Sequence, residues 1–276
     1  MRALVLTYHS HNIAGTSYAA NDHVALATDL RLLTQAGARI VPLGRIVRAL
    51  HARLEGEGLL VGLTFDDGPV FDFADFDHRR FGRQRSFFNI LRDFDIELGP
   101  RAQPELHATS FVIASPEARA AMERAEDCGY TDLQGWLADG WWSAAIDSGL
   151  MGIGNHSWDH VHHAVPQIAV AKDARDDFSV VDNAGDADRE IRAATRFIRA
   201  KTGGRCEHFA FPFGHAPRYL VEEYLPQRGD RHGMSAAFGV EGRAVHPGDS
   251  PWNIPRLVCG HHWKSPEALR ALLAGG

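Results

Sequence analysis

The stretch Leu59–Gly68, LLVGLTFDDG, sets the expectation for the fold. Its first part, Leu59–Phe65, is an almost continuous hydrophobic run, which is typical of a strand buried on both faces of a parallel sheet. Two adjacent carboxylates, Asp66 and Asp67, follow at the carboxyl end of this strand. Because Asp-Gly is also a common turn pair, this segment alone is compatible with an ordinary turn.

Strand-like and helix-like runs alternate along the rest of the chain. Strands are predicted at residues 4–8, 40–43, 107–114, 150–154, 207–213, 234–240 and 253–259, and helices at 24–37, 45–54, 132–148 and 186–201 and after Ser115 and Ser265. Such alternation predicts a parallel sheet covered by helices, either doubly wound or closed into a barrel. Residues 70–103 interrupt this alternation and are interpreted as an insertion that forms either a lid or a wall of the substrate site. The whole chain, residues 1–276, is interpreted as one domain.

Composition narrows the classes of function. With 276 residues, 45% of them apolar, the chain can bury a large core, and its net charge of −6 argues against a nucleic-acid partner. The basic run Arg79–Arg85 is interpreted as a solvated loop, with contact to an anionic part of a substrate as the alternative. Three scattered cysteines argue against a disulfide framework or a thiolate zinc site. Neither a signal peptide nor a membrane span is recognised, so a cytoplasmic location is predicted.

A second chemical motif, His156-Ser157-Trp158-Asp159-His160, follows the strand predicted at 150–154. Two imidazoles four residues apart can converge on one ion if the segment forms a helical turn. The motif is not the HExxH protease signature, because Ser157 stands where that motif needs its glutamate. One aspartate and two histidines supply three ligands and leave positions for water, as in a catalytic zinc site, while a spare carboxylate can accept a proton.

Several segments resemble motifs of the polysaccharide deacetylase (NodB-homology) family. Thr64–Gly68 is similar to the TFDDG motif, His156–His160 to the H(S/T)xxH motif, and Ala108–Val112 to the strand that lies between them in the family. Phe209–Gly214 is similar to the family's RxxPYG-like segment. The resemblance implies a distorted (β/α)7-type barrel.

The same resemblance implies roles for individual residues. Asp66 would be the catalytic base, and a backbone N–H of Phe213, next to Pro212 in the groove wall, would hold the developing oxyanion. A divalent metal is expected, with Zn²⁺ first and Co²⁺, Ni²⁺ and Mn²⁺ as alternatives. Its implied ligands are Asp67, His156 and His160.

The chain departs from the family in its third and late motifs. The third motif lacks the arginine that braces the base in many members, so Arg256 is the candidate for this role, with a structural salt bridge as the alternative. The late LxLxH motif has only a loose counterpart in Leu257–His261, which makes His261 the predicted proton donor, ahead of His215 and His246. The family's fourth motif has no convincing match.

Two further residues lie near these motifs. His9 follows the first predicted strand and is interpreted as a hydrogen-bonded structural histidine, with a place in the site as the alternative. Trp158 lies inside the histidine motif and is predicted to stack on a sugar ring.

The predicted function is metal-dependent removal of an N-acetyl or similar acyl group from an amino sugar, oligosaccharide or polysaccharide. One alternative is an amide or imide hydrolase of a small metabolite on the same fold, and another is a non-catalytic carbohydrate-binding protein. A non-haem Fe(II) oxygenase would also use two histidines and one carboxylate, but it would leave Asp66 without a role. The oligomeric state is left open.

Overall fold

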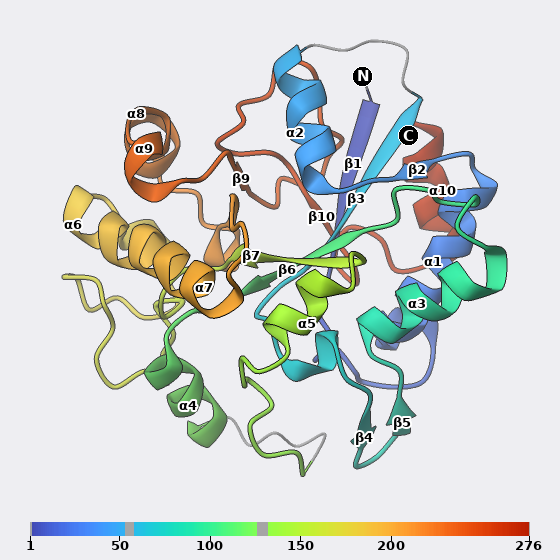
Figure 1. Ribbon diagram of the computed structural model, residues 1–276, viewed down its shortest axis with the longest axis horizontal. Helices are drawn as coiled ribbons and strands as arrows, with labels where there is room; N and C mark the ends of the chain where they lie inside the picture. The colour runs from blue at the N-terminus through green and yellow to red at the C-terminus, as the bar shows by residue number, and fades with distance from the viewer. Residues whose placement is uncertain (1, 53–57, 126–131, 276) are drawn as a thin grey trace.

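A computed structural model describes residues 2–52, 58–125 and 132–275 and contains one large parallel sheet with helices around it (Figure 1). The strands follow the order β10-β1-β3-β6-β7-β8-β9, and β2 pairs with β3 off this path. Their bounds are β1 Arg2–Tyr8, β2 Arg39–Ile40, β3 Leu59–Phe65, β6 Ala108–Val112, β7 Met151–Asn155, β8 His208–Ala210, β9 Ala236–Phe238 and β10 Leu257–Val258. A separate antiparallel hairpin consists of β4 Phe76–His78 and β5 Gly82–Gln84.

The sheet curls until its two ends approach each other. A parallel bridge joins Phe238, at the end of β9, to Ile254, which precedes β10. The N–H of Gly239 donates to the carbonyl of Ile254, and the N–H of Ile254 donates to the carbonyl of Ala237. The predicted distorted barrel built from seven parallel strands is therefore confirmed.

The helices begin and end at residues suited to those positions. The side chains of Asn21, Ser86 and Ser265 accept backbone N–H groups at the starts of α1, α3 and α10, and Gly203 ends α7 in a left-handed conformation. The α-helices are α1 Asp22–Gln35, α2 Leu43–Ala52, α3 Phe87–Leu98, α4 Pro116–Ala125, α5 Trp142–Asp147, α6 Ala184–Ala187, α7 Ala194–Thr202, α8 Leu225–Gln227, α9 Gly229–His232 and α10 Pro266–Ala274. Within the described ranges, no helix has the length and apolar character needed to cross a membrane.

Shorter turns complete the chain between these elements. Segments η4 and η6 are π-helical, and η4 joins α6 to α7 in one continuous helical run. The remaining short segments are 3₁₀ turns. The bounds are η1 Tyr18–Ala20, η2 Val70–Asp72, η3 Phe178–Val180, η4 Asp188–Ala193, η5 Pro212–Gly214 and η6 Leu220–Tyr224.

Strand β3 lies inside the sheet, between β1 and β6. It pairs with β1 along its whole length, while β2 and β6 share its other edge. All residues of β3 after Leu59 are buried, which explains its continuous hydrophobic run. Because β1, β3, β6 and β7 run parallel, their carboxyl ends meet at one end of the barrel, and the aspartate pair and the histidine motif lie there together.

The helix predicted at 132–148 is wrong over its first part. Only α5 is helical among residues 132–148, and the preceding residues form turns. Gly135 has a left-handed backbone, with φ of 73°, which is incompatible with a regular right-handed helix at this position. Trp136 and Leu137 are buried in a cluster with Phe71 and Met122 instead of lying on a helix face.

Residues 70–103 contain η2, the β4–β5 hairpin and α3. Phe71 and Phe76 stack with ring centroids 3.9 Å apart, and both belong to the cluster that includes Trp136. In Figure 1 the hairpin projects beyond the helices at the lower edge of the molecule. Phe71 and Phe76 therefore pack in one cluster with Trp136, and the hairpin extends outward from the molecule.

Gly68, directly after the paired aspartates, offers a test of how closely β3 and β6 approach. It has φ of +67°, and a Cβ added there would lie 2.8 Å from the backbone Cα of Val112. We expect Gly68→Ala to lower the free energy of unfolding by about 2–4 kcal/mol, since it combines overpacking with a left-handed backbone. Urea unfolding of the chelated protein measures this loss.

Gly82 provides the matched control for this substitution. It has φ of +70°, and a Cβ added there would meet nothing within 4 Å. Gly82→Ala should therefore cost only about 1 kcal/mol, for the backbone conformation alone. Equal losses for the two variants would contradict the close approach at Gly68.

Candidate metal centre

The three predicted metal ligands converge at the carboxyl ends of β3 and β7. Asp67 is the second residue after β3, while His156 and His160 come from the loop after β7, residues 156–161, here called the metal loop. The Nε2 atoms of His156 and His160 lie 3.5 and 3.6 Å from Oδ1 of Asp67. A tetrahedral ion with ligands at about 2.0–2.1 Å would separate its donor atoms by about 3.4 Å. The triad is therefore consistent with a divalent metal.

The surroundings of His156 support this fit. Its Nδ1 lies 2.9 Å from the carbonyl oxygen of Ala210, at the end of β8. A carbonyl oxygen can only accept a hydrogen bond, so Nδ1 carries a hydrogen, and Nε2, which faces Asp67, is the ring atom left to bind a metal. A ligand histidine held through its other nitrogen is the usual arrangement in metal proteins.

The metal loop is not the helical turn on which the histidine spacing depended. Ser157, His160 and Val161 all have positive φ, at 74°, 63° and 51°. Both imidazoles still reach Asp67, because the loop folds back on itself instead of winding into a helix. The two histidines therefore lie close to Asp67 as predicted, but through the geometry of this loop and not through helical spacing.

Arg256 forms a buried two-point ion pair with Asp66. Its Nη1 and Nη2 donate to Oδ1 and Oδ2 of Asp66 at 2.7 and 2.9 Å, and its Nε donates to the carbonyl of Gly239 at 3.0 Å. Arg256 is fully buried and Asp66 is 5% exposed. The guanidinium that the third motif lacks is thus found at the start of the last strand.

Charges around the site tune its acids and bases. Burial alone would raise the pKa of Asp66, but the Arg256 guanidinium and His156 outweigh it and hold that pKa below its ordinary value. Burial and the charge of His156 lower the pKa of His160 to about 3, so this imidazole is neutral near pH 7. Asp66 is therefore ionised and able to accept a proton, and His160 is in the form that binds metals.

A cavity of about 400 Å³ opens over these groups. His9 and His11 line it along with the ligands and Asp66, and Nδ1 of His11 lies 3.7 Å from Oδ2 of Asp67. Apolar side chains also line it, among them Ile113, Met122, Trp136 and Leu137. The cavity thus joins a charged floor to a hydrophobic side.

His9 differs from its interpretation as a hydrogen-bonded structural histidine. Its backbone N–H donates to Asp22, but its ring Nδ1 is buried and has no hydrogen-bond partner in the part of the chain that the structure describes. The ring lines the cavity. His11, which also lines the cavity, was not singled out from the sequence, because neither histidine belongs to a recognised motif.

The other predicted site residues lie in different surroundings. Phe213 lines the cavity, is 40% exposed and has φ of +57°, and its ring packs edge-on against His160 with centroids 4.3 Å apart. Pro212, just before it, is buried. Trp158 packs edge-on against Phe197 and does not line this cavity.

The three predicted proton donors, His261, His215 and His246, do not line the cavity. His261 is exposed in the turn that follows β10 and is not part of the cavity wall. His215 contacts Asp177 at 3.3 Å on the surface, and His246 is exposed. None of these three imidazoles faces Asp66 across the cavity.

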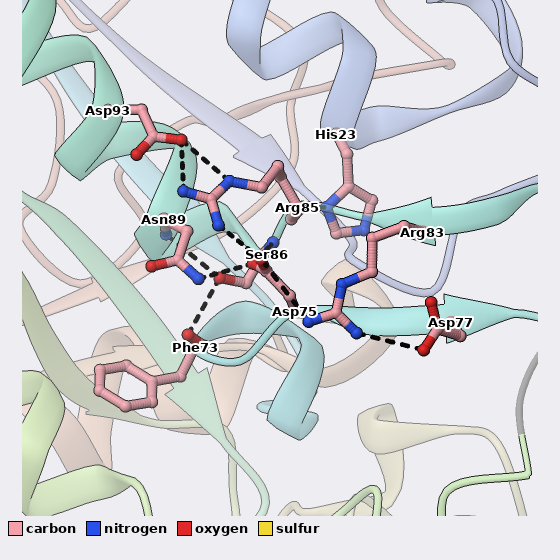
Figure 2. Close-up of polar contacts among 9 residues, drawn as sticks. All are labelled: His23, Phe73, Asp75, Asp77, Arg83, Arg85, Ser86, Asn89 and Asp93. Carbon is pink, nitrogen blue, oxygen red and sulfur yellow. Dashed lines mark hydrogen bonds and ion pairs between the residues drawn. The ribbon is translucent and has the colours of Figure 1, made fainter.

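Neutralising contacts surround the basic run Arg79–Arg85. Figure 2 shows Arg83 directed at Asp77 and Arg85 at Asp93, and neither arginine lines the cavity at the metal centre. The pairs are Arg79–Asp132, Arg83–Asp77, Arg85–Asp75 and Arg85–Asp93. The interpretation as a solvated surface segment is favoured over contact with an anionic substrate.

A second group of potential donors lies beside the first. His162, His163 and Asp176 bring their donor atoms within 4.8 Å of one another. Nδ1 of His163 contacts both carboxylate oxygens of Asp176, at 3.0 and 3.1 Å, and Nδ1 of His162 accepts the N–H of Ala164. We therefore interpret this group as part of a hydrogen-bonded loop and not as a second metal site.

Comparison with known proteins agrees with this geometry. Residues 101–226 match the family model described as polysaccharide deacetylase. The resemblance to the polysaccharide deacetylase family is confirmed. The matched segment includes His156 and His160 but not Asp66 and Asp67, which precede it. The search of curated proteins found no match to this chain.

Solved structures with a deacetylase fold resemble the chain over nearly its whole length. IcaB from Ammonifex degensii is 22% identical with a TM-score of 0.62, covering 99% of this chain and 96% of its own. The Streptococcus pyogenes deacetylase PplD, solved with acetate, is 15% identical with a TM-score of 0.62, covering 99% and 98%. A de-N-acetylase from Aggregatibacter actinomycetemcomitans is 15% identical with a TM-score of 0.63, covering 99% and 100%. At these identities the likeness shows a shared fold.

The Asp66–Arg256 pair generates a prediction about pH. In the wild type the folded pKa of Asp66 lies below its unfolded value of about 3.9, so the pair stabilises the fold above that pH and less as pH falls through the folded pKa. Arg256→Met leaves a buried carboxylate unpaired. We expect it to lose about 3–5 kcal/mol at pH 7, and the difference from the wild type should narrow toward pH 4.

Urea unfolding of the chelated proteins across this pH range measures the difference. Arg243→Met is the matched control, because Arg243 forms a two-point pair with Asp249 while its side chain is 45% exposed. That variant should change stability by less than about 1 kcal/mol. An equal effect of both substitutions, or no dependence on pH for Arg256→Met, would contradict the assignment of a buried pair.

Proposed function

We propose that the protein is a metal-dependent hydrolase that removes an N-acetyl or similar small acyl group from an amino sugar or its oligomers. The observation that carries this proposal is the meeting of the Asp67–His156–His160 triad and the Arg256-braced Asp66 in one cavity. We propose Zn²⁺ as the metal, because a small site with one carboxylate and two imidazoles suits it, with Co²⁺, Ni²⁺ and Mn²⁺ as alternatives. Membership in a deacetylase family supports an acetylated sugar as substrate.

The metal, when bound by the triad, supplies Lewis-acid polarisation of the acyl carbonyl and a lowered pKa for water. Asp66 is the general base of the proposal and takes the proton of the attacking water. Arg256 holds the Asp66 carboxylate by two hydrogen bonds and keeps it ionised, so the carboxylate is oriented and in the form that can accept a proton.

Phe213 contributes its backbone N–H to the negative charge that develops on the acyl oxygen. It lies at the cavity wall next to His160. Phe213 has a left-handed backbone, which is unusual for a bulky residue. Such a conformation persists only where the surrounding structure enforces it, and it is found often in active sites.

His9 is the proposed general acid, in place of His261. Its ring lines the cavity that contains Asp66, whereas His261 is exposed outside that cavity. Protonation of the departing amine by His9 would complete hydrolysis of the amide bond. The other open alternative, a protein that only binds carbohydrate, has no use for an ionised, braced carboxylate beside the triad.

Acetate release from a panel of N-acetylated sugars, oligosaccharides and small amides tests the proposal. We expect release from at least one amino sugar that stops on chelation and returns with Zn²⁺ or Co²⁺. Asp66→Asn should keep its metal and lose about 10²–10⁴-fold in kcat, while His156→Ala should lose both metal and activity. Full turnover by Asp66→Asn, or release that persists without metal, would refute the mechanism.

The choice of acid is tested with a pair of histidine variants. His9→Gln should lower kcat by about 10²–10⁴-fold with little change in metal content, because it removes only the proton donor. His261→Gln is the control and should keep kcat within about threefold of the wild type. A large loss at His261 with normal turnover by His9→Gln would return the role to His261.

A further inference from the structure

The metal loop adopts a conformation that its own residues do not favour. Three of its residues have left-handed φ and none of the three is glycine. Residues other than glycine adopt this region only where neighbouring contacts enforce it. Some part of the structure must therefore hold the loop in place even before a metal binds.

Side chains satisfy five consecutive amides of this loop. Three of the acceptors are local to the loop. The N–H groups of residues 157, 160 and 161 donate to Asn155 Oδ1, Ser157 Oγ and Asp159 Oδ1 at 2.7, 2.9 and 2.8 Å.

The two amides between them depend on a distant residue. The N–H groups of Trp158 and Asp159 both donate to Oε2 of Glu190, at 3.1 and 3.3 Å. Glu190 is fully buried. It is thus the acceptor that fixes the middle of the loop, between the two histidine ligands.

Glu190 reaches the loop from the π-helical segment η4. A π turn is uncommon and displaces the side chains within it relative to a regular helix. The same segment is anchored to the loop by Asn155, whose Nδ2 donates to the carbonyl of Ile191 and the hydroxyl of Thr195, both at 2.9 Å. Ile191 lies in η4 and Thr195 lies in α7, so the helical run and the strand end that leads into the loop are joined again on the C-terminal side of Glu190.

We infer that Glu190 is a positioning residue for the metal centre: it holds the amides of residues 158 and 159 so that His156 and His160 converge on Asp67. This inference rests on the proposed metal site and adds a residue that touches neither metal nor substrate. Its removal leaves two buried N–H groups without their acceptor, and the loop can then relax away from the geometry of the ligands. Partners that orient metal ligands typically contribute about 10–100-fold to metal affinity.

Glutamine is the conservative replacement at this position. Burial, with a further contribution from Asp159, raises the pKa of Glu190 well above its ordinary value, so a neutral amide of the same length is its nearest substitute. The amide oxygen of Glu190→Gln can accept the same two N–H groups, whereas the side chain of Glu190→Ala cannot.

Asp188 supplies the matched control, since it lies in the same π-helical segment and contacts other partners. Its carboxylate accepts from the Tyr224 hydroxyl at 2.7 Å and from Arg231 at 2.8 Å. Asp188→Ala should lower thermal stability without moving the metal loop.

The experiment measures Zn²⁺ affinity by competition with a chromophoric chelator, and the visible absorption of the Co²⁺-loaded proteins. We expect Glu190→Ala to weaken Zn²⁺ binding by about 10–100-fold and to alter the Co²⁺ spectrum, while Glu190→Gln and Asp188→Ala stay within about threefold of the wild type with unchanged spectra. Should Glu190→Ala fail to fold, Glu190→Asp replaces it, because the shorter carboxylate does not reach both amides.

Two results separate failure of this inference from failure of the proposed function. Wild-type affinity and spectrum in Glu190→Ala or Glu190→Asp would overturn the role of Glu190 while leaving the metal site intact. Equal weakening in Asp188→Ala and Glu190→Gln would also overturn it, since the effect would then be general destabilisation. Absence of Zn²⁺ binding by the wild type would instead refute the site itself.

Discussion

A buried ion pair between Asp66 and Arg256 connects the two sides of the curled sheet. Asp66 follows β3 directly, while Arg256 lies between the bridge from Ile254 to β9 and the start of β10. Two charges removed from water are tolerated only when each satisfies the other, and here both carboxylate oxygens and the guanidinium nitrogens are engaged. The pair therefore fixes the position of the proposed base and the closure of the fold together.

Sequence predicted the parts of this arrangement that depend on local pattern. The continuous apolar run of β3, the alternation of strands and helices, and the positions of Asp67, His156 and His160 at strand ends follow from periodicity and motif. From the sequence, Arg256 could be named only as a candidate partner of Asp66, because no local pattern indicates that a residue 190 positions later would contact it. For the same reason a place in the site was only the alternative for His9, and His11 was not singled out at all, although both line the cavity.

Two errors have clear physical causes. The pattern at 132–148 suggested one helix, but Gly135 and the burial of Trp136 against Phe71 favoured turns. The histidine spacing suggested a helical turn, whereas the metal loop is held in a left-handed conformation by side chains that include the remote Glu190. In both cases a tertiary contact outweighed a local preference, and such contacts are invisible in one sequence.

In the proposed site, one divalent ion is bound by Asp67, His156 and His160. Anomalous scattering at the zinc edge from crystals of the zinc-loaded protein tests it most directly. We expect one strong peak at about 2.0–2.2 Å from a carboxylate oxygen of Asp67 and from Nε2 of both histidines. A peak at His162, His163 and Asp176 in its place, or no ordered ion near Asp67, would contradict it.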